Sequence, residues 1–153
     1  MNKVHFSSET IYWETPRAFF EKINEEFEFR LDVCANTQNA KCFRFFSEED
    51  NGLLQEWKGT CWMNPPYDNK KNWVIKAYNE SVKNKCVVVC LIPARTNTNW
   101  WHEYCQKGEI RFVKGRPKFE GMTHGLPQPL AVVIFGTNYS SNYKSVELTG
   151  EKE

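Results

Sequence analysis

The sequence lacks the features that mark membrane-spanning, secreted and zinc-binding proteins. Its apolar run at Val87–Ile92 has the length of a strand, whereas a membrane-spanning helix needs roughly 20 apolar residues. The polar first residues lack the apolar segment of a signal peptide. None of the six cysteines forms a Cys-x-x-Cys pair, and the three histidines lack metal-ligand spacing. We therefore expect no membrane span, no metal site and reduced, buried thiols.

The sequence also lacks the length and the linkers of a multidomain protein. No internal repeat, low-complexity segment or linker divides its 153 residues, which are enough for one compact core and too few for two ordinary domains. We expect a single domain over residues 1–153, with an ordered core at about 9–136 and a C-terminal tail at 137–153. A separate recognition domain is not expected.

Net charge is only +1, but the two signs are unevenly distributed. Residues 1–57 contain 6 Lys/Arg and 11 Asp/Glu, whereas residues 58–153 contain 14 and 8. The densest basic stretch is KGEIRFVKGRPKF, in which aromatic residues lie between the cations. Such a stretch favours a polyanionic partner such as nucleic acid, and the alternative is a charged hairpin that faces only water.

Hydrophobic periodicity predicts an α/β protein. Apolar residues recur at helical spacing after Thr15-Pro16, a pair that suits a helix start. Residues 86–93 are apolar on both faces, like a central strand covered by helices. The last two predicted strands have no helix between them, which indicates an antiparallel hairpin that ends a mostly parallel sheet. Helices are predicted at 16–27, 71–84 and 100–106, and strands at 29–35, 42–46, 60–64, 86–93, 109–113 and 130–136.

The turn Asn64-Pro65-Pro66-Tyr67 stops the predicted strand 60–64, because proline cannot donate the amide proton of a strand ladder. The Asn64 side-chain oxygen and the Pro65 carbonyl can both point outward and accept hydrogen bonds from one exocyclic amine. This frees the lone pair of that amine for attack on an electrophile, which only a bound cofactor can supply. The Tyr67 ring offers a face on which a planar base stacks. The alternative is a plain strand terminator with a surface tyrosine.

Six motifs in one order resemble the phage and prophage DNA N6-adenine methyltransferases of the Dam type. They are YWETPRAFFEKIN, EFEFRLDVCA, NAKCFRFFSEED followed by NGL, WMNPPY, LIPARTNTNWW and FVKGRPKF. The resemblance covers about residues 9–136. It implies a Rossmann-like methyltransferase fold, S-adenosyl-L-methionine as cofactor, and transfer of its methyl group to adenine N6 in double-stranded DNA.

The resemblance also implies which residues bind the cofactor. Trp13, Thr15 and Pro16 are similar to an N-terminal cofactor motif and are expected to touch the methionine moiety, although Thr15 and Pro16 also suit a plain helix start. Asp32 is expected to pair with the cofactor's ammonium group, with a surface acid as the alternative. Asn64 is expected to lie at the border between cofactor and substrate.

Two further parts of the cofactor site follow from the same resemblance. The small residues Cys34 and Ala35 are expected to let the cofactor approach the backbone closely. One acid among residues 48–50 is expected to bind its ribose or adenine, and Asp50 is chosen. The alternative for Asp50 is a helix cap or a solvated charge, because Asn51 occupies the place before Gly-Leu where relatives often carry the acid.

The remaining motifs are assigned to DNA. Arg95 and Thr96, with Thr98, follow the predicted central strand and are expected to hold phosphate or the edge of the target pocket. Trp100 and Trp101 are interpreted as core anchors more readily than as base contacts. The basic hairpin is expected to face phosphate and to offer an aromatic wall to a flipped adenine, with core packing as the alternative for the aromatic residue. The residues assigned there are Lys114, Arg116, Lys118 and Phe119.

Two other functions are compatible with the sequence. An Asn-Pro-Pro-Tyr turn also suits methylation of RNA bases or of protein glutamine amides, and a catalytically silent DNA-binding protein is the third reading. The basic second half of the chain favours a polyanion over protein. We expect a monomer or homodimer in the cytoplasm of a bacterium or a phage-infected cell.

Overall fold

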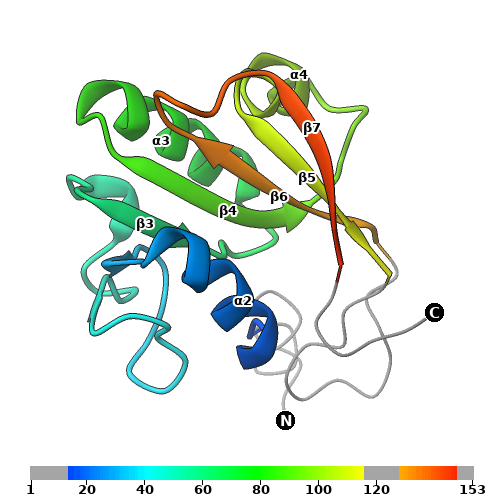
Figure 1. The fold of residues 1–153 in the computed structure, drawn as a ribbon. Helices are drawn as coiled ribbons and strands as arrows, with labels where there is room; N and C mark the ends of the chain where they lie inside the picture. The colour runs from blue at the N-terminus through cyan, green and yellow to red at the C-terminus, as the bar shows by residue number, and fades with distance from the viewer. Residues whose placement is uncertain (1–13, 116–127, 148–153) are drawn as a thin grey trace, which may run out of the picture.

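The protein folds around one twisted, seven-stranded sheet. A computed structural model describes residues 14–115 and 128–147 (Figure 1). The strand order is β2-β1-β3-β4-β6-β5-β7, and β6 runs antiparallel to its neighbours β4 and β5 while all other pairs are parallel. The strands are β1 Leu31–Asp32, β2 Arg44–Phe45, β3 Thr60–Met63, β4 Val87–Pro93, β5 Glu109–Lys114, β6 Leu130–Phe135 and β7 Asn142–Glu147.

Helices cover both faces of the sheet, which gives three layers (Figure 1). Helix α2 packs on one face, where its four apolar positions meet Trp62 of β3 and alternate residues of β4 and β6. Helices α3 and α4 pack on the opposite face and contribute a second cluster rich in tryptophan. The helices are α2 Arg17–Phe27, α3 Lys70–Lys83 and α4 Asn99–Glu103, with short 3-10 turns at Gly52–Leu54 (η1) and Cys105–Lys107 (η2).

The fold class predicted from the sequence is confirmed. All six predicted strands are present, and β5 and β6 form the expected antiparallel hairpin. Strand β4 is buried along almost its whole length, as expected of a central strand. Strands β1 and β2 contain only two residues each, fewer than the predicted runs, and no helix lies between them. Trp100 and Trp101 are buried core residues, which confirms their interpretation as anchors.

Two features of the C-terminal half differ from the expectation. Strand β7 was not predicted, and its parallel pairing with β5 extends the ordered core beyond residue 136. Arg111 was counted among the cations of the nucleic-acid stretch, but its side chain is directed at α2. There it forms two hydrogen bonds with Glu26, at 2.7 and 2.8 Å, and a third with Glu109 of its own strand at 2.6 Å. Arg111 is therefore a structural tie rather than a DNA contact.

Replacing Arg111 with alanine is expected to lower the free energy of unfolding by about 1.5–3 kcal/mol, because it removes the closest cation from the Glu109 carboxylate. The Glu109 side chain is only 6% exposed, and among the described residues it then keeps only Asn142 at 3.3 Å and Lys144 at 3.6 Å. The matched variant Glu26→Ala removes a 45% exposed partner and leaves the Arg111–Glu109 pair intact, so a loss below about 1 kcal/mol is expected. Urea unfolding followed by circular dichroism measures both values. Equal losses in the two variants would contradict the assignment.

No helix within residues 14–115 and 128–147 has the length and apolar character needed to cross a membrane.

Candidate active site

A polar cleft opens where β1 and β3 end. These neighbouring strands are parallel, with Asp32 beside Trp62, so their carboxyl ends meet at one edge of the sheet. Asn64 follows β3 directly, and the N-terminal segment that leads into α2 closes the other side. The cleft is lined by Glu14, Thr15, Asp32, Cys34, Asn39, Lys41, Trp62 and Asn64. The structure thus brings together the two strand ends that the sequence analysis selected.

The Asn64 amide is held in a fixed orientation inside this cleft. Its Nδ2 atom donates a hydrogen bond to Thr15 Oγ1 at 3.0 Å, and its Oδ1 atom is buried. Thr15 is almost completely buried, and Pro16 rather than Thr15 occupies the N-cap position of α2. The helix thus starts directly after Thr15-Pro16, close to the expected position, and the Thr15 hydroxyl orients Asn64. This contact joins two segments that lie 49 residues apart.

The two prolines of the turn have different roles. The Pro66 carbonyl accepts the backbone N–H of Asn69 at 3.2 Å. Within the described part of the chain, no hydrogen bond is found on the Pro65 carbonyl. Both rings are buried, which keeps the turn rigid, and Pro65 is not among the residues that line the cleft. Binding of a substrate amine by the Pro65 carbonyl stays a prediction.

Tyr67 is the last residue of the turn. Its half-buried ring packs against the cluster under α2, and burial raises the pKa of its hydroxyl. The Tyr67 hydroxyl is buried without a hydrogen-bond partner in the described residues, and the ring is absent from the cleft lining. Its backbone carbonyl accepts a hydrogen bond from Lys70 Nζ at 2.8 Å. Stacking of a base on Tyr67 stays a prediction.

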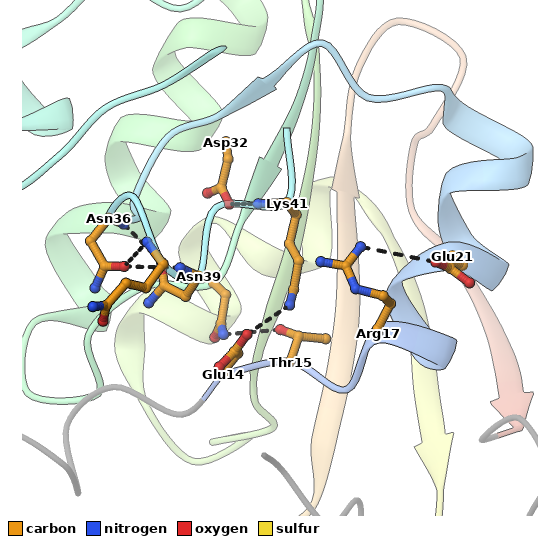
Figure 2. A network of polar contacts seen from close by, with 10 residues as sticks. Glu14, Thr15, Arg17, Glu21, Asp32, Asn36, Asn39 and Lys41 are labelled. Atoms are coloured by element: carbon orange, nitrogen blue, oxygen red, sulfur yellow. Dashed lines mark hydrogen bonds and ion pairs between the residues drawn. The ribbon is translucent and has the colours of Figure 1, made fainter. Parts of the chain in front are cut away.

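Asp32 is the buried acid of the site and is only 2% exposed, which excludes the alternative of a surface acid. Its two oxygens accept the backbone N–H groups of Cys34 at 3.2 Å and of Lys41 at 3.0 Å. Figure 2 shows the contact with Lys41. Burial raises the pKa of the Asp32 carboxyl to about 7, and the two hydrogen bonds and the charge of Lys41 oppose this rise only in part. The ionised form of Asp32 is therefore incompletely compensated by the protein alone.

Two charged residues of the cleft were missed by the sequence analysis. Lys41 Nζ forms an ion pair with Glu14 Oε1 at 3.4 Å, and the Lys41 side chain is only 4% exposed (Figure 2). A signal was present, because Lys41 is the single cation between residues 31 and 43. Glu14 lay inside the quoted WETP motif without being assigned a role, and only the folding of the N-terminal segment over the cleft brings it to Lys41.

The other residues assigned to the cofactor lie in different surroundings. Cys34 lines the cleft, and the Ala35 N–H donates to Phe46 O at 3.0 Å, which extends the pairing of β1 and β2. Asp50 is exposed and is not part of the cleft lining; its carboxylate accepts hydrogen bonds from the backbone and hydroxyl of Ser47. The role of Asp50 in cofactor binding stays a prediction. Trp13 lies outside the described residues.

The residues assigned to DNA are placed only in part. Arg95 and Thr96 are exposed in the loop that leaves β4, the strand next to β3. Thr98 caps α4 through a hydrogen bond to the Trp101 N–H at 3.3 Å. Lys114 is exposed at the end of β5, while Arg116, Lys118 and Phe119 lie outside the described residues. No group of three His, Cys, Asp or Glu side chains able to hold a metal ion occurs among the residues that the structure describes.

Comparisons with known proteins find a matching family and related sequences. The sequence model of the family "DNA N-6-adenine-methyltransferase (Dam)" matches residues 5–144. The DNA N-6-adenine-methyltransferase of Haemophilus phage HP1 is 37% identical, over 92% of this chain and 90% of that protein. A protein of the same name from Escherichia phage T1 is 32% identical, over 67% of this chain and 44% of its own length.

A solved structure described as a predicted O-methyltransferase from Agrobacterium tumefaciens covers 71% of this chain and 56% of its own, with a TM-score of 0.34 and 16% identity. The match to the family over residues 5–144 and the similarity to the phage HP1 protein over nearly the full length of both chains identify the chain: it belongs to the DNA N-6-adenine-methyltransferase (Dam) family.

Proposed function

We propose that the chain transfers a methyl group from S-adenosyl-L-methionine to the exocyclic N6 of adenine in double-stranded DNA. The observation that supports this most directly is the meeting of the Asn64 amide and the buried Asp32 carboxyl in one cleft. The Asn64 amide, which can accept a hydrogen bond from an amine, thus lies in the same cleft as the Asp32 carboxylate, whose negative charge the protein neutralises only in part. The phage relatives bear the name of this activity.

The side chains of the cleft fit the proposed cofactor. Asp32 is buried, its pKa is raised to about 7, and its charged form gains most from a cationic partner such as the ammonium group of S-adenosyl-L-methionine. The small Cys34 side chain leaves room beside it at the end of β1. When bound, the cofactor supplies an electrophilic methyl group on a sulfonium. No metal is required for this chemistry.

The Asn-Pro-Pro-Tyr turn activates the amine. Because the Asn64 nitrogen donates to Thr15, the Oδ1 atom is the end of the amide directed away from Thr15 and is the acceptor for one N6 proton. The Pro65 carbonyl accepts the other proton. These two acceptors would free the N6 lone pair for attack on the methyl group that the bound cofactor would supply. Transfer would turn the cofactor's sulfonium into the thioether of S-adenosylhomocysteine, and the proton lost by N6 would pass to solvent water. The products are N6-methyladenine and S-adenosylhomocysteine, without a covalent enzyme intermediate.

The adenine must leave the base stack to reach Asn64, at a cost of a few kcal/mol. Arg95 and Thr96 lie on the loop after β4, which starts from the same edge of the sheet as the turn, and are suited to hold the DNA backbone. The chain after β5 adds the basic residues and the aromatic wall proposed from the sequence. The residues proposed to contact DNA are Arg95, Thr96, Lys114, Arg116, Lys118 and Phe119.

The place of action follows from the substrate. We propose that the protein acts in the cytoplasm of a bacterium or a phage-infected cell, where such DNA is found, as a monomer or homodimer. A domain of this size has a radius of gyration of about 15 Å, so a dimer would widen its footprint on DNA.

Incubation with methyl-labelled S-adenosyl-L-methionine and duplex DNA, RNA or protein tests this proposal. Label is expected in duplex DNA as N6-methyladenine, identified by mass spectrometry of the hydrolysed nucleosides. Label in RNA or in glutamine amides would instead establish one of the other substrates. Absence of saturable S-adenosyl-L-methionine binding would indicate a catalytically silent DNA-binding protein.

A further inference from the structure

The cleft contains an ion pair, between Lys41 and Glu14, that has no role in the proposed methyl transfer. The Lys41 side chain is only 4% exposed, and its ammonium group lies 3.4 Å from Glu14 Oε1. Burying a lysine charge is costly unless it is well paired. Among the described residues the ion-pair partner of Lys41 is Glu14, whose side chain is itself 39% exposed, and the buried Asp32 carboxyl adds a longer-range attraction. A buried cation on a cleft wall whose direct ion pair is this loosely held is suited to bind the anionic group of a ligand.

The surroundings of this ion pair define what the anion belongs to. Glu14, Asp32 and Lys41 all line the same cleft, so two carboxyl groups and one ammonium group face one small volume (Figure 2). The backbone N–H of Lys41 also donates to Asp32 at 3.0 Å, which fixes the lysine and the buried acid relative to each other. The arrangement is complementary to a molecule that carries one carboxylate and one ammonium on neighbouring carbons.

We propose that Lys41 and Glu14 bind the zwitterionic amino-acid end of the cofactor. Lys41 Nζ binds the carboxylate of the cofactor, and Glu14 and Asp32 together bind the ammonium group of the cofactor. This inference rests on the proposed function, in which S-adenosyl-L-methionine is the methyl donor. The Lys41–Glu14 ion pair opens to admit the head group and exchanges one internal salt bridge for two to the ligand. A thioether of adenosine without an amino-acid end makes none of these contacts.

A purely structural role makes a different prediction. Glu14 and Lys41 lie 27 residues apart, so their ion pair also ties the N-terminal segment to the loop between β1 and β2. If the ion pair only held these two segments together, breaking it would deform the cleft and lower the affinity for every ligand of the cleft by a similar factor. If the ion pair instead recognises the head group, breaking it lowers the affinity only for ligands that carry that group. Two ligands that differ by the head group separate the two roles.

The experiment measures binding of S-adenosylhomocysteine and of 5′-methylthioadenosine by calorimetry, with the full-length protein and with Lys41→Met. We expect the wild type to bind S-adenosylhomocysteine at least tenfold more tightly than 5′-methylthioadenosine. In Lys41→Met this preference should fall at least tenfold, while the dissociation constant for 5′-methylthioadenosine stays within about threefold. The control Lys58→Met removes a 76% exposed ammonium paired with Glu56 at 3.9 Å and should change neither value.

Glu14→Gln provides a second variant, which keeps the shape of a half-exposed side chain and is expected to fold. It should weaken the binding of S-adenosylhomocysteine and of decarboxylated S-adenosylmethionine, both of which carry the ammonium group. Lys41→Met should leave the decarboxylated ligand, which lacks the carboxylate, within about threefold of its wild-type affinity.

Equal weakening of both calorimetry ligands in Lys41→Met, or no weakening, would overturn the inference while leaving the proposed function in place. A wild type that binds both ligands equally well would overturn the inference alone. A wild type that binds neither ligand would overturn the inference together with the proposed cofactor.

Discussion

Replacement of Asn64 with alanine is expected to lower the rate of methyl transfer to duplex DNA by about 10²–10³-fold or more. The variant removes an acceptor that is fixed before the substrate arrives and that strengthens its hydrogen bond as positive charge develops on N6. The fold should remain, because the loss of the Thr15 contact costs only about 1 kcal/mol. Single-turnover transfer of labelled methyl groups measures the rate, and calorimetry with S-adenosylhomocysteine should show retained binding.

Two further variants sharpen this test. Asn72→Ala removes the same side chain from the exposed surface of α3, where it contacts only Asn69 among the described residues, and it should leave the rate unchanged. Thr15→Val removes the hydroxyl that orients Asn64 and should give a rate between those of the wild type and Asn64→Ala. Wild-type activity in Asn64→Ala would disprove the mechanism proposed for the turn.

The second large effect concerns pH, and it arises from the buried carboxyl of Asp32. Its pKa is about 7 in the folded protein against an ordinary value of 3.8. Well below its ordinary pKa of 3.8 the group is protonated in both the folded and the unfolded state and carries no penalty. As pH rises from about 4 to 7, the unfolded state ionises first, so the folded protein loses stability relative to it, by about 2–4 kcal/mol in total. Above pH 7 the loss is complete.

Unfolding of the ligand-free wild type and of Asp32→Asn at pH 4 to 8 measures this loss. The stability of Asp32→Asn relative to the wild type should increase across this range and level off near pH 7. Asp50→Asn is the control of opposite sign, because hydrogen bonds from Ser47 lower the pKa of the exposed Asp50 carboxyl. For that pair the wild type should lose stability relative to the variant only as pH falls through the lowered pKa. Parallel curves for the wild type and Asp32→Asn would contradict the argument.

The same carboxyl explains why stability and binding oppose each other in this cleft. The ionised Asp32 that weakens the ligand-free fold is the form that pairs with an ammonium group. We therefore expect affinity for S-adenosylhomocysteine to rise between pH 5 and 8 in the wild type. In Asp32→Asn the affinity should be lower, with most of this dependence on pH removed.

The sequence predicted the parts of the site that depend on neighbouring strands. A double proline ends β3, Asp32 ends β1, and the carboxyl ends of parallel strands meet at one edge, so the cleft followed from local patterns. The Lys41–Glu14 ion pair did not follow, because nothing in either segment specifies that the N-terminal residues fold over the end of β1. The contact of Arg111 with Glu26 did not follow either, because a charge pattern along one strand does not show which helix covers it.

Strand β7 was missed for a different reason. Its sequence NYKSVE is mostly polar, since an edge strand buries little of its surface and its pairing with β5 depends on backbone hydrogen bonds that any sequence can make. Periodicity identifies strands by the apolar face that they bury, and it is weak where that face is partly exposed.

Helix α2 is fixed at both ends to different parts of the protein. Before its first residue, Thr15 accepts a hydrogen bond from the Asn64 amide, and in its last turn Glu26 binds Arg111 of β5. The 11-residue length of the helix thus sets the distance between these two attachments. One inserted residue adds about 1.5 Å and turns the helix by about 100°, so both attachments could not be kept. Under the proposed function, the length of α2 therefore fixes how far the methyl-transfer site lies from the residues proposed to contact DNA.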